Sequence, residues 1–353
     1  MNIDRSAPVL VTGGNGYIAS WVVKQLLDDG VDVHATVRDP ADEAKTGHLR
    51  RMAESVPGTL TLFEADLLDD GSFDEAMAGC ELVIHTASPF VLSGVKDPQR
   101  ELVDPAVEGT RNALGSVNRT TSVKRVVLTS SVVSIYGDAA DLPAGREVFT
   151  EDDWNTTSSL DHQPYPYSKV LAERAAWEMA EAQDRWDLVV INPGFVIGPS
   201  LTNASSSASF STLKQIVDGT MRMGAPSLEL GVVDVRDVAQ AHIKAGFTPE
   251  AHGRHICVSR SATFLELGQA LRKEFGSRYP FPRRELPKPL VWLAAPSAGI
   301  TRRYVALNVG HPLKFDNRRA REELGVDFRP IETSVVEFFQ QLMADGVVRD
   351  RSS

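Results

Sequence analysis

Short apolar runs alternate with longer segments of helical periodicity along the first two hundred residues. The runs that we expect to form buried strands span residues 9–11, 31–37, 60–64, 82–85, 125–129 and 187–191. Between them, apolar residues recur three or four positions apart, which is the spacing of helices that bury one face. Strands that alternate with helices predict an α/β fold whose doubly wound parallel sheet is covered on both faces.

The first expected strand leads into a glycine-rich turn, because residues 9–20 read VLVTGGNGYIAS. Gly13, Gly16 and Ala19 have the spacing of a dinucleotide-binding turn, with alanine in place of the third glycine. The N-terminus of a helix carries partial positive charge, and glycine removes the side chain that would keep a phosphate away. The turn therefore predicts a Rossmann-type fold that binds the pyrophosphate of a dinucleotide.

The second expected strand ends in Arg38, which is followed by Asp39 and later by Lys45. In a dinucleotide fold a carboxylate at this strand end binds the 2′-hydroxyl of NAD, whereas a cation binds the 2′-phosphate of NADP. Arginine favours NADP because its planar guanidinium suits phosphate. A solvated charged loop and NAD binding through Asp39 both stay open.

The alternation of strands and helices changes after residue 200. The run LTNASSSASFS at 201–211 is expected to be a flexible linker or a loop at the edge of the site. A strand at 231–238 and a helix that ends near residue 245 are expected to return to the sheet.

The remaining segments predict a smaller mixed α/β lobe, with a strand at 255–258 and helices at 264–275 and 331–343. We therefore expect two units. Residues 1–200 are expected to form an NADP-binding domain, to which 230–248 returns. Residues 201–353 are expected to form a smaller substrate-binding lobe.

Composition excludes several classes of protein. With 42% hydrophobic and 24% charged residues, the chain is expected to be globular. A formal net charge of −10 argues against nucleic acid as a partner, since phosphate attraction needs clustered cations. The longest apolar stretch near the end, 289–300, is too short and too rich in proline to cross a bilayer, and the first residues have no apolar signal core. We expect a cytoplasmic protein with no membrane partner.

Cysteine and histidine offer no sign of a metal or disulfide framework. Cys80 and Cys257 lie in apolar runs, which predicts reduced, buried thiols. His252 and His255 have a loose metal-like spacing but no acidic or cysteine partners, so we expect surface histidines and no metal site.

Candidate chemistry lies after the fifth expected strand. Ser131 follows that strand, and a polar, turn-rich loop of about thirty residues separates it from a helix that begins near Tyr165. Tyr165 and Lys169 are four residues apart and hence share a face of that helix, whereas Tyr167 has the wrong spacing. A neighbouring ammonium is expected to lower the pKa of the Tyr165 phenol from about 10. Tyr165 would then protonate a carbonyl oxygen, Lys169 would hold the phenol and the nicotinamide ribose, and Ser131 would polarise the carbonyl. An ordinary surface Tyr–Lys pair is the alternative.

Several motifs together give the chain a specific resemblance. The glycine turn and the motifs TSS, YPYSK and INPGFVIGP occur in the order and spacing of extended short-chain dehydrogenases/reductases. The segments TVRDP, HTASPF, EVFTEDDW and VDVRDVAQAHI are similar to the branch that contains dihydroflavonol 4-reductase, cinnamoyl-CoA reductase and microbial ketone and methylglyoxal reductases. The resemblance extends from Val9 to about Phe275.

This resemblance implies a catalytic triad of Ser131, Tyr165 and Lys169, of which Tyr165 and Lys169 also bind the cofactor. Further NADP(H) contacts implied by the resemblance are Gly13, Asn15, Gly16, Tyr17, Ile18, Arg38, Lys45, Asp66, Leu67, Ala87, Val196 and one serine within 205–209, for which Ser209 is our choice.

The chain also departs from related branches. Sugar epimerases usually have Asn where Ala106 stands in AVEGT, which fits a reductase better than an epimerase. The loop after Ser131 and the region beyond Pro280 differ from the plant flavonoid enzymes, so flavonoid specificity is not carried over.

The resulting hypothesis is an NADPH-dependent carbonyl reductase that converts a ketone or aldehyde to an alcohol. Phe90, Val132 and Phe195 follow strand-end motifs and are expected to form apolar walls for a hydrophobic or aromatic small-molecule carbonyl substrate. We expect a monomer or homodimer. The alternatives are an NAD-dependent nucleotide-sugar epimerase or hydroxysteroid-type dehydrogenase, and a non-catalytic NADPH-sensing protein, against which the intact triad argues.

Overall fold

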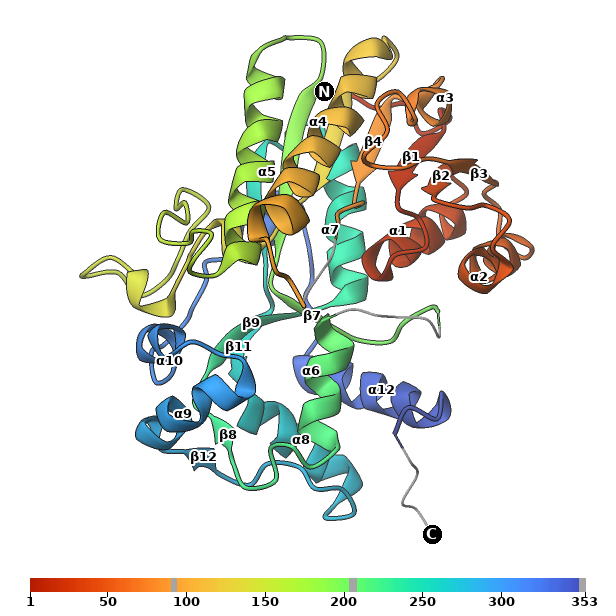
Figure 1. The fold of residues 1–353 in the computed structure, drawn as a ribbon. Helices are drawn as coiled ribbons and strands as arrows, with labels where there is room; N and C mark the ends of the chain where they lie inside the picture. Colours follow the sequence, from red (N-terminus) through yellow and green to blue (C-terminus); the bar gives the residue numbers. More distant parts are fainter. Residues whose placement is uncertain (90–93, 203–207, 349–353) are drawn as a thin grey trace.

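A computed structural model describes residues 1–89, 94–202 and 208–348, and within these residues seven parallel strands form the central sheet (Figure 1). Their order is β10-β6-β5-β4-β1-β2-β3. The strands are β1 (Val9–Thr12), β2 (Val33–Val37), β3 (Leu60–Glu64), β4 (Leu82–His85), β5 (Arg125–Thr129), β6 (Asp187–Pro193) and β10 (Gly253–Cys257). The predicted Rossmann-type, doubly wound α/β fold is confirmed.

Successive residues of β1, β4 and β5 enter two different cores, which is why these central strands are largely apolar rather than alternating. On β1, Val9 and Val11 belong to the core beneath one face, and Leu10 belongs to the core beneath the other. The first face is covered by α1 (Tyr17–Asp28), α2 (Glu43–Ala53) and α7 (Val235–Phe247). The second face is covered by α3 (Asp74–Met77), α4 (Asp104–Arg119) and α5 (Pro164–Glu181).

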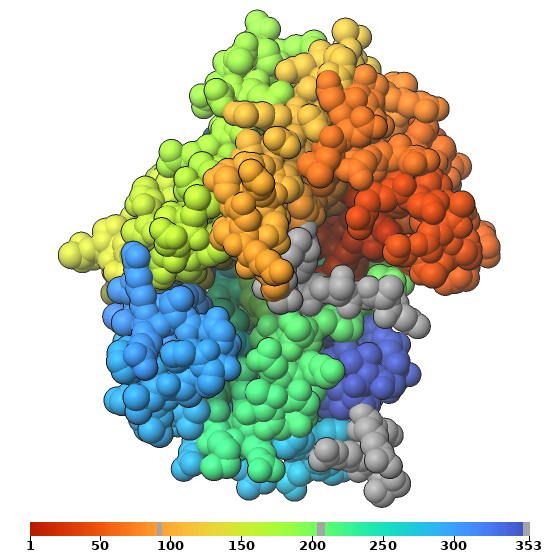
Figure 2. Space-filling view, in the orientation of Figure 1, coloured from red at the N-terminus to blue at the C-terminus, as the bar shows by residue number. Residues whose placement is uncertain are grey.

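A further core, separate from the two beneath the sheet, lies beyond the carboxyl ends of the central strands (Figure 1). It is formed around a three-stranded sheet of β7 (Phe195–Ile197), β9 (Glu229–Asp234) and β11 (Arg260–Thr263). The helices packed there are α6 (Ala208–Val217), α8 (Phe264–Phe275) and α12 (Ile331–Ala344). Smaller elements complete this lobe: β8 (Ala225–Pro226), β12 (Glu285–Leu286), α9 (Lys288–Ala294) and α10 (Arg302–Asn308). The surface is indented where the two parts of the molecule meet (Figure 2).

The expected return of a strand at 231–238 to the central sheet is wrong. Residues 231–234 belong to β9, which pairs with β7 and β11, and residues 235–238 begin α7, while β10 lies beside β6 in the central sheet. Gly194 explains the exit of the chain, because a Cβ there would lie 2.2 Å from the carbonyl oxygen of Gly231. The glycine lets β7 diverge from β6 and pair closely with β9. Helix α7 packs beside α1.

Two smaller expectations need correction. Residues 208–211, expected as loop, are the first turn of α6, and residues 203–207 of the same run lie outside the described part. His255, expected at the surface, is fully buried on β10, where its Nε2 lies 3.1 Å from Glu323 of α11 (Arg318–Glu322 and its C-cap). The predicted division into two domains stays a prediction.

The described residues show the state of the two cysteines and can be searched for metal-binding groups and membrane-spanning helices. Cys80 and Cys257 are buried and unpaired, as predicted. Within the described ranges no group of three acidic, histidine or cysteine residues is placed to hold a metal ion. In the same ranges no helix has both the length and the apolar character needed to cross a membrane.

Arg125 joins the end of α7 to the central sheet and yields a stability prediction. Its side chain is fully buried, makes two hydrogen bonds to Asp187, and donates to the carbonyl oxygens of Ala245, Thr248, Pro249 and Ala251. Arg125→Met should lower the free energy of unfolding by about 3 kcal/mol, because these buried acceptors lose their donor.

Urea denaturation would measure this change. Arg111→Met is the matched control, since the Arg111–Glu178 pair is exposed and is expected to contribute less than about 0.5 kcal/mol. Equal effects of the two substitutions would contradict the assigned role of Arg125.

Candidate active site

The glycine turn is held between β2 and the end of β4. The Gly14 N–H donates to the Thr36 carbonyl at 2.8 Å, and a Cβ on Gly13 would lie 3.1 Å from the Ala87 Cβ. Gly13 also has a φ of 66°, a conformation that residues with a side chain rarely adopt. The turn therefore requires glycine for both space and backbone conformation, which fits the approach of a phosphate to this backbone.

The N-terminus of α1 is free of the groups that would compete with a phosphate. Gly16 is the N-cap and forms no side-chain cap, and the first turn carries no acidic residue. Ala19, the third position of the motif, is buried against the sheet core, so its methyl group is accommodated. The Tyr17 phenol donates to the Gly198 carbonyl at 2.5 Å, and burial raises its pKa well above 10. Its side chain thus connects α1 to the segment after β7.

Thr12 connects this turn to β4. Its hydroxyl oxygen accepts the backbone N–H groups of Thr86 and Ala87, both at 3.1 Å, and lies 2.8 Å from His85 Nδ1. With two donors on its oxygen, the hydroxyl gives its own proton to His85, which is therefore neutral. Burial agrees, because it lowers the pKa of His85 to about 4. This junction was not found from the sequence.

Arg38, which directly follows β2, is exposed. The Asp39 carboxylate accepts the Ala41 N–H at 2.8 Å, and the Lys45 ammonium pairs with Asp42 at 2.8 Å. Asp39 and Lys45 thus already have partners, which leaves Arg38 as the better candidate for a 2′-phosphate. The Asp66 carboxylate caps its own turn by accepting the Leu68 N–H.

Tyr165 is the second residue of α5, and Lys169 lies one turn later. The Lys169 Nζ is 5.9 Å from the centroid of the Tyr165 ring and donates to Ser88 Oγ at 2.9 Å. Burial lowers the pKa of Lys169 to about 8 and raises that of Tyr165 to about 12. The expectation that the ammonium lowers the tyrosine pKa is wrong in this structure, because burial disfavours the phenolate more strongly. The phenol is therefore protonated at neutral pH.

Ser131 lies after β5 and begins the 3₁₀ turn Val132–Ser134. Its Oγ accepts the Val133 N–H at 3.3 Å and lies 3.4 Å from the Pro193 carbonyl at the end of β6. Helix α5 packs against this turn. The fold thus brings the segments that carry Ser131, Tyr165 and Lys169 together at the carboxyl ends of β4, β5 and β6, where doubly wound sheets bind ligands.

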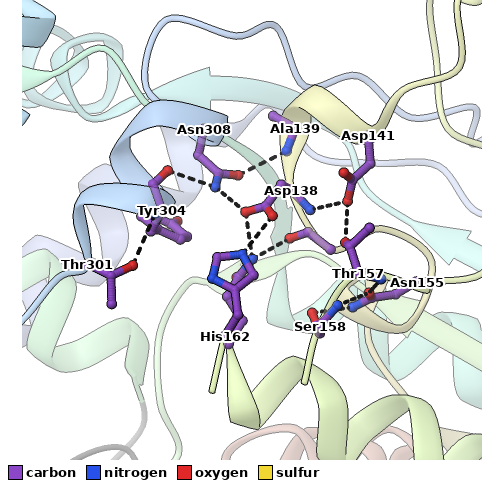
Figure 3. A network of polar contacts seen from close by, with 12 residues as sticks. Asp138, Ala139, Asp141, Asn155, Thr157, Ser158, His162, Thr301, Tyr304 and Asn308 are labelled. Carbon is purple, nitrogen blue, oxygen red and sulfur yellow. Dashed lines mark hydrogen bonds and ion pairs between the residues drawn. The ribbon is translucent and has the colours of Figure 1, made fainter. Parts of the chain in front are cut away.

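A buried carboxylate holds the segment that leads into α5 (Figure 3). Asp138 is fully buried and lies 2.7 Å from His162 Nε2, and it also accepts from Gln163 at 2.8 Å. Gln163 has a φ of 58°, the one positive φ outside glycine in the described ranges. These two contacts hold the strained residue that precedes Pro164 and Tyr165.

The third donor to Asp138 comes from the second lobe. The side-chain amide nitrogen of Asn308, on α10, donates to Asp138 at 2.5 Å. The side-chain amide oxygen of Asn308 accepts the Ala139 N–H at 2.9 Å (Figure 3). The buried Asp138 carboxylate therefore connects the start of the Tyr165 helix with the lobe. Reading the sequence did not find this contact, because its partners are 170 positions apart.

The remaining predicted site residues have varied surroundings. Val132 is buried in an apolar cluster with Ile135 and Phe149, while Phe195 packs against the core of the second lobe. Val196 is nearly buried on β7, and Ser209 is buried on α6. Phe90 lies outside the described residues. The roles assigned to all of these stay predictions.

Comparison with known proteins agrees with this geometry. The model of the NAD dependent epimerase/dehydratase family matches residues 9–258. The chain belongs to this family. Its members of the extended short-chain dehydrogenase/reductase type depend on NAD(P), so the predicted family and the predicted enzyme class, an oxidoreductase with a nicotinamide cofactor, are confirmed.

Individual relatives of this extended short-chain dehydrogenase/reductase are reductases. The chain is 37% identical to cinnamoyl-CoA reductase CAD2 of Medicago truncatula, over 95% of each protein. It is 36% identical to anthocyanidin reductase of Arabidopsis thaliana, over 78% of this chain and 81% of the relative. The crystal structure of Gre2 from Candida albicans in complex with NADPH superposes with a TM-score of 0.76 at 29% identity, over 96% of this chain and 99% of that chain.

The surroundings of Arg38 generate a prediction about cofactor choice. Arg38→Ala should raise the dissociation constant for NADPH about tenfold and leave that for NADH nearly unchanged, because a charge-assisted hydrogen bond to the 2′-phosphate is lost. Titration of protein fluorescence with each cofactor would measure both constants. Lys45→Ala is the control with a smaller expected effect, since that ammonium is paired with Asp42. A parallel loss of NADH binding would argue against 2′-phosphate recognition.

Proposed function

We propose that the protein is an NADPH-dependent carbonyl reductase in which Tyr165 donates the proton to the carbonyl oxygen. The observation that carries the proposal is the half-buried phenol of Tyr165, with a pKa of about 12, beside the Lys169 ammonium. Similarity to reductases over nearly the whole chain supports the reaction class. Similarity to Gre2 crystallised with NADPH, together with the exposed position of Arg38 after β2, supports the choice of NADPH.

The mechanism assigns one task to each residue of the triad. When bound, NADPH supplies the hydride that adds to the carbonyl carbon. Tyr165 gives its phenolic proton to the oxygen, on which the electron pair of the C=O bond becomes localised, and an alcohol results. Ser131 donates a hydrogen bond to the same oxygen and so stabilises its developing negative charge.

Lys169 compensates the charge that Tyr165 acquires. After proton transfer the phenol becomes a phenolate in a buried site, which is unfavourable without a nearby cation. The Lys169 ammonium lies 5.9 Å from the ring centroid and supplies that positive charge. Because burial lowers its pKa only to about 8, it is largely protonated at neutral pH.

We further propose a small, hydrophobic or aromatic carbonyl compound as the substrate. Support comes from the similarity to reductases named for cinnamoyl-CoA and anthocyanidin substrates. Phe195 is half-buried at the edge of the second lobe and is proposed as one wall of the pocket, with Val132 as another. A cytoplasmic location and a monomeric or homodimeric state stay predictions.

Replacing Tyr165 by Phe tests the proton donor. Tyr165→Phe should reduce turnover of a reactive aryl ketone by about 10²- to 10⁴-fold, since the general acid is lost, while NADPH still binds. The measurement is NADPH consumption in parallel with a binding titration. Tyr167→Phe is the matched control on the same helix, and its turnover should stay close to that of the parent protein. Full turnover by Tyr165→Phe would exclude the assigned donor.

The pKa of Lys169 predicts the pH dependence of the reaction. The ammonium is charged below about pH 8 and neutral above it, so kcat for reduction should fall as the pH rises through about 8. Tyr165, with a pKa of about 12, keeps its proton over the same range and cannot cause that decrease. Steady-state rates between pH 6 and pH 10 would measure it, and a flat profile would contradict a charged Lys169 in the reaction.

A further inference from the structure

A second buried carboxylate lies one helical turn beyond Lys169 on α5. Glu173 is 1% exposed, and both of its oxygens accept several hydrogen bonds. Oε1 accepts from Arg254 Nε at 2.6 Å and from the Trp177 indole at 3.4 Å. Oε2 accepts from Asn192 at 3.0 Å and also contacts the hydroxyl groups of Ser130 and Ser134. No step of the reaction described above uses this carboxylate.

The donors come from the ends of three neighbouring strands. Ser130 follows β5, Asn192 belongs to β6, and Arg254 belongs to β10. A single carboxylate on α5 therefore binds donors from three neighbouring strands, near the carboxyl ends of β5 and β6 and at the second residue of β10. Since Lys169 and Glu173 are four residues apart, they share one face of the helix. The bonds of Glu173 thus restrict how α5 can rotate or slide relative to the sheet.

Arg254 extends this network to the long loop before α5. Its guanidinium is 6% exposed, donates to the carbonyl oxygens of Glu151 and Asp153, and lies 4.1 Å from the ring of Trp154. Buried ion pairs of this kind are weak evidence for stability, because desolvation of both charges offsets their attraction. The Glu173–Arg254 pair is better explained if it holds the strand ends, the loop and α5 in one fixed arrangement.

Two partners of Glu173 also hold Ser131. Asn192 has two amide protons, and one is directed to Glu173 while the other is directed to the Ser131 carbonyl at 3.2 Å. The Ser134 hydroxyl lies 2.5 Å from Glu173 and 2.7 Å from the same carbonyl. The carboxylate is therefore connected through single side chains to Ser131 on one side and along the helix to Lys169 on the other.

We propose that the buried Glu173–Arg254 ion pair is a positioning device that sets Lys169 and Ser131 relative to each other for the reaction. Neither residue touches the substrate in this role. The proposal rests on the proposed function and deepens it by adding two residues that act through the triad.

The positioning role of Glu173 can be measured through the pKa of Lys169, because few other charged groups face this ammonium. Glu173 raises the pKa of Lys169 and so opposes the lowering caused by burial. The other groups that face Lys169 are Ser88 after β4, His85 on β4 and Tyr165 on its own helix. His85 has a pKa of about 4 and Tyr165 a pKa of about 12, so both keep one charge state between pH 6 and pH 10. Arg254 keeps its charge throughout this range.

The first experiment compares Glu173→Gln with Glu178→Gln. Glu173→Gln keeps the shape of the side chain but removes its charge, so the decrease of kcat with pH should move to lower pH by about one unit. We also expect kcat at pH 7 to fall about ten- to a hundredfold through loss of alignment, with a smaller change in KM. Glu178 lies on the same helix in an exposed pair with Arg111, and its variant should behave as the parent protein does.

A second variant separates positioning from folding. Glu173→Gln alone leaves the Arg254 charge buried without its partner, which can itself unfold the protein. Glu173→Gln combined with Arg254→Met removes both charges, and we expect a folded protein by circular dichroism whose kcat is still reduced about ten- to a hundredfold. Parental kcat and pH profile in the folded double variant would overturn the proposal. Failure of the proposed function is distinguishable, because the parent protein would then reduce no carbonyl compound at any pH.

Discussion

Burial of the Glu173 carboxylate requires hydrogen-bond donors from three strands, and this requirement connects the fold to the chemistry of the site. Helix α5 carries the candidate proton donor at its first turn and the carboxylate two turns later. Two of the strands that supply these donors, β5 and β6, end beside Ser131. An α/β sheet brings strand ends together by topology alone, but the orientation of the helix above them depends on such specific polar contacts.

A second buried carboxylate, Asp138, holds the segment that leads into α5. Its donors are His162 and Gln163, which precede the helix, and Asn308, which belongs to the second lobe (Figure 3). One buried acid therefore anchors α5 to the sheet, and the other anchors the start of α5 to the lobe. The segment that leads into α5 is thus tied to the second lobe and α5 itself to the sheet, which fits a site whose chemistry needs cofactor and substrate together.

Burial also decides the protonation states at this site. The spacing of Tyr165 and Lys169 suggested a phenol of lowered pKa, yet burial raises the pKa of Tyr165 to about 12 and lowers that of Lys169 to about 8. A protonated phenol beside a cation suits a donor that must release its proton to a developing alkoxide.

The sequence by itself determined the elements whose signals are local. The glycine turn, the strand ends at Arg38 and Ser131, and helix α8 at Phe264–Phe275 follow from neighbouring residues, and the family motifs follow from their order. Only the tertiary structure decided which strand occupies the edge of the central sheet, since β9 and β10 are both short strands of mixed apolar and polar residues and differ in the partner they meet. The same is true of buried His255 and of the contacts of Asp138 and Glu173. These depend on residues distant in the chain, and a polar side chain has no local pattern that reveals which partner will satisfy it when it is buried.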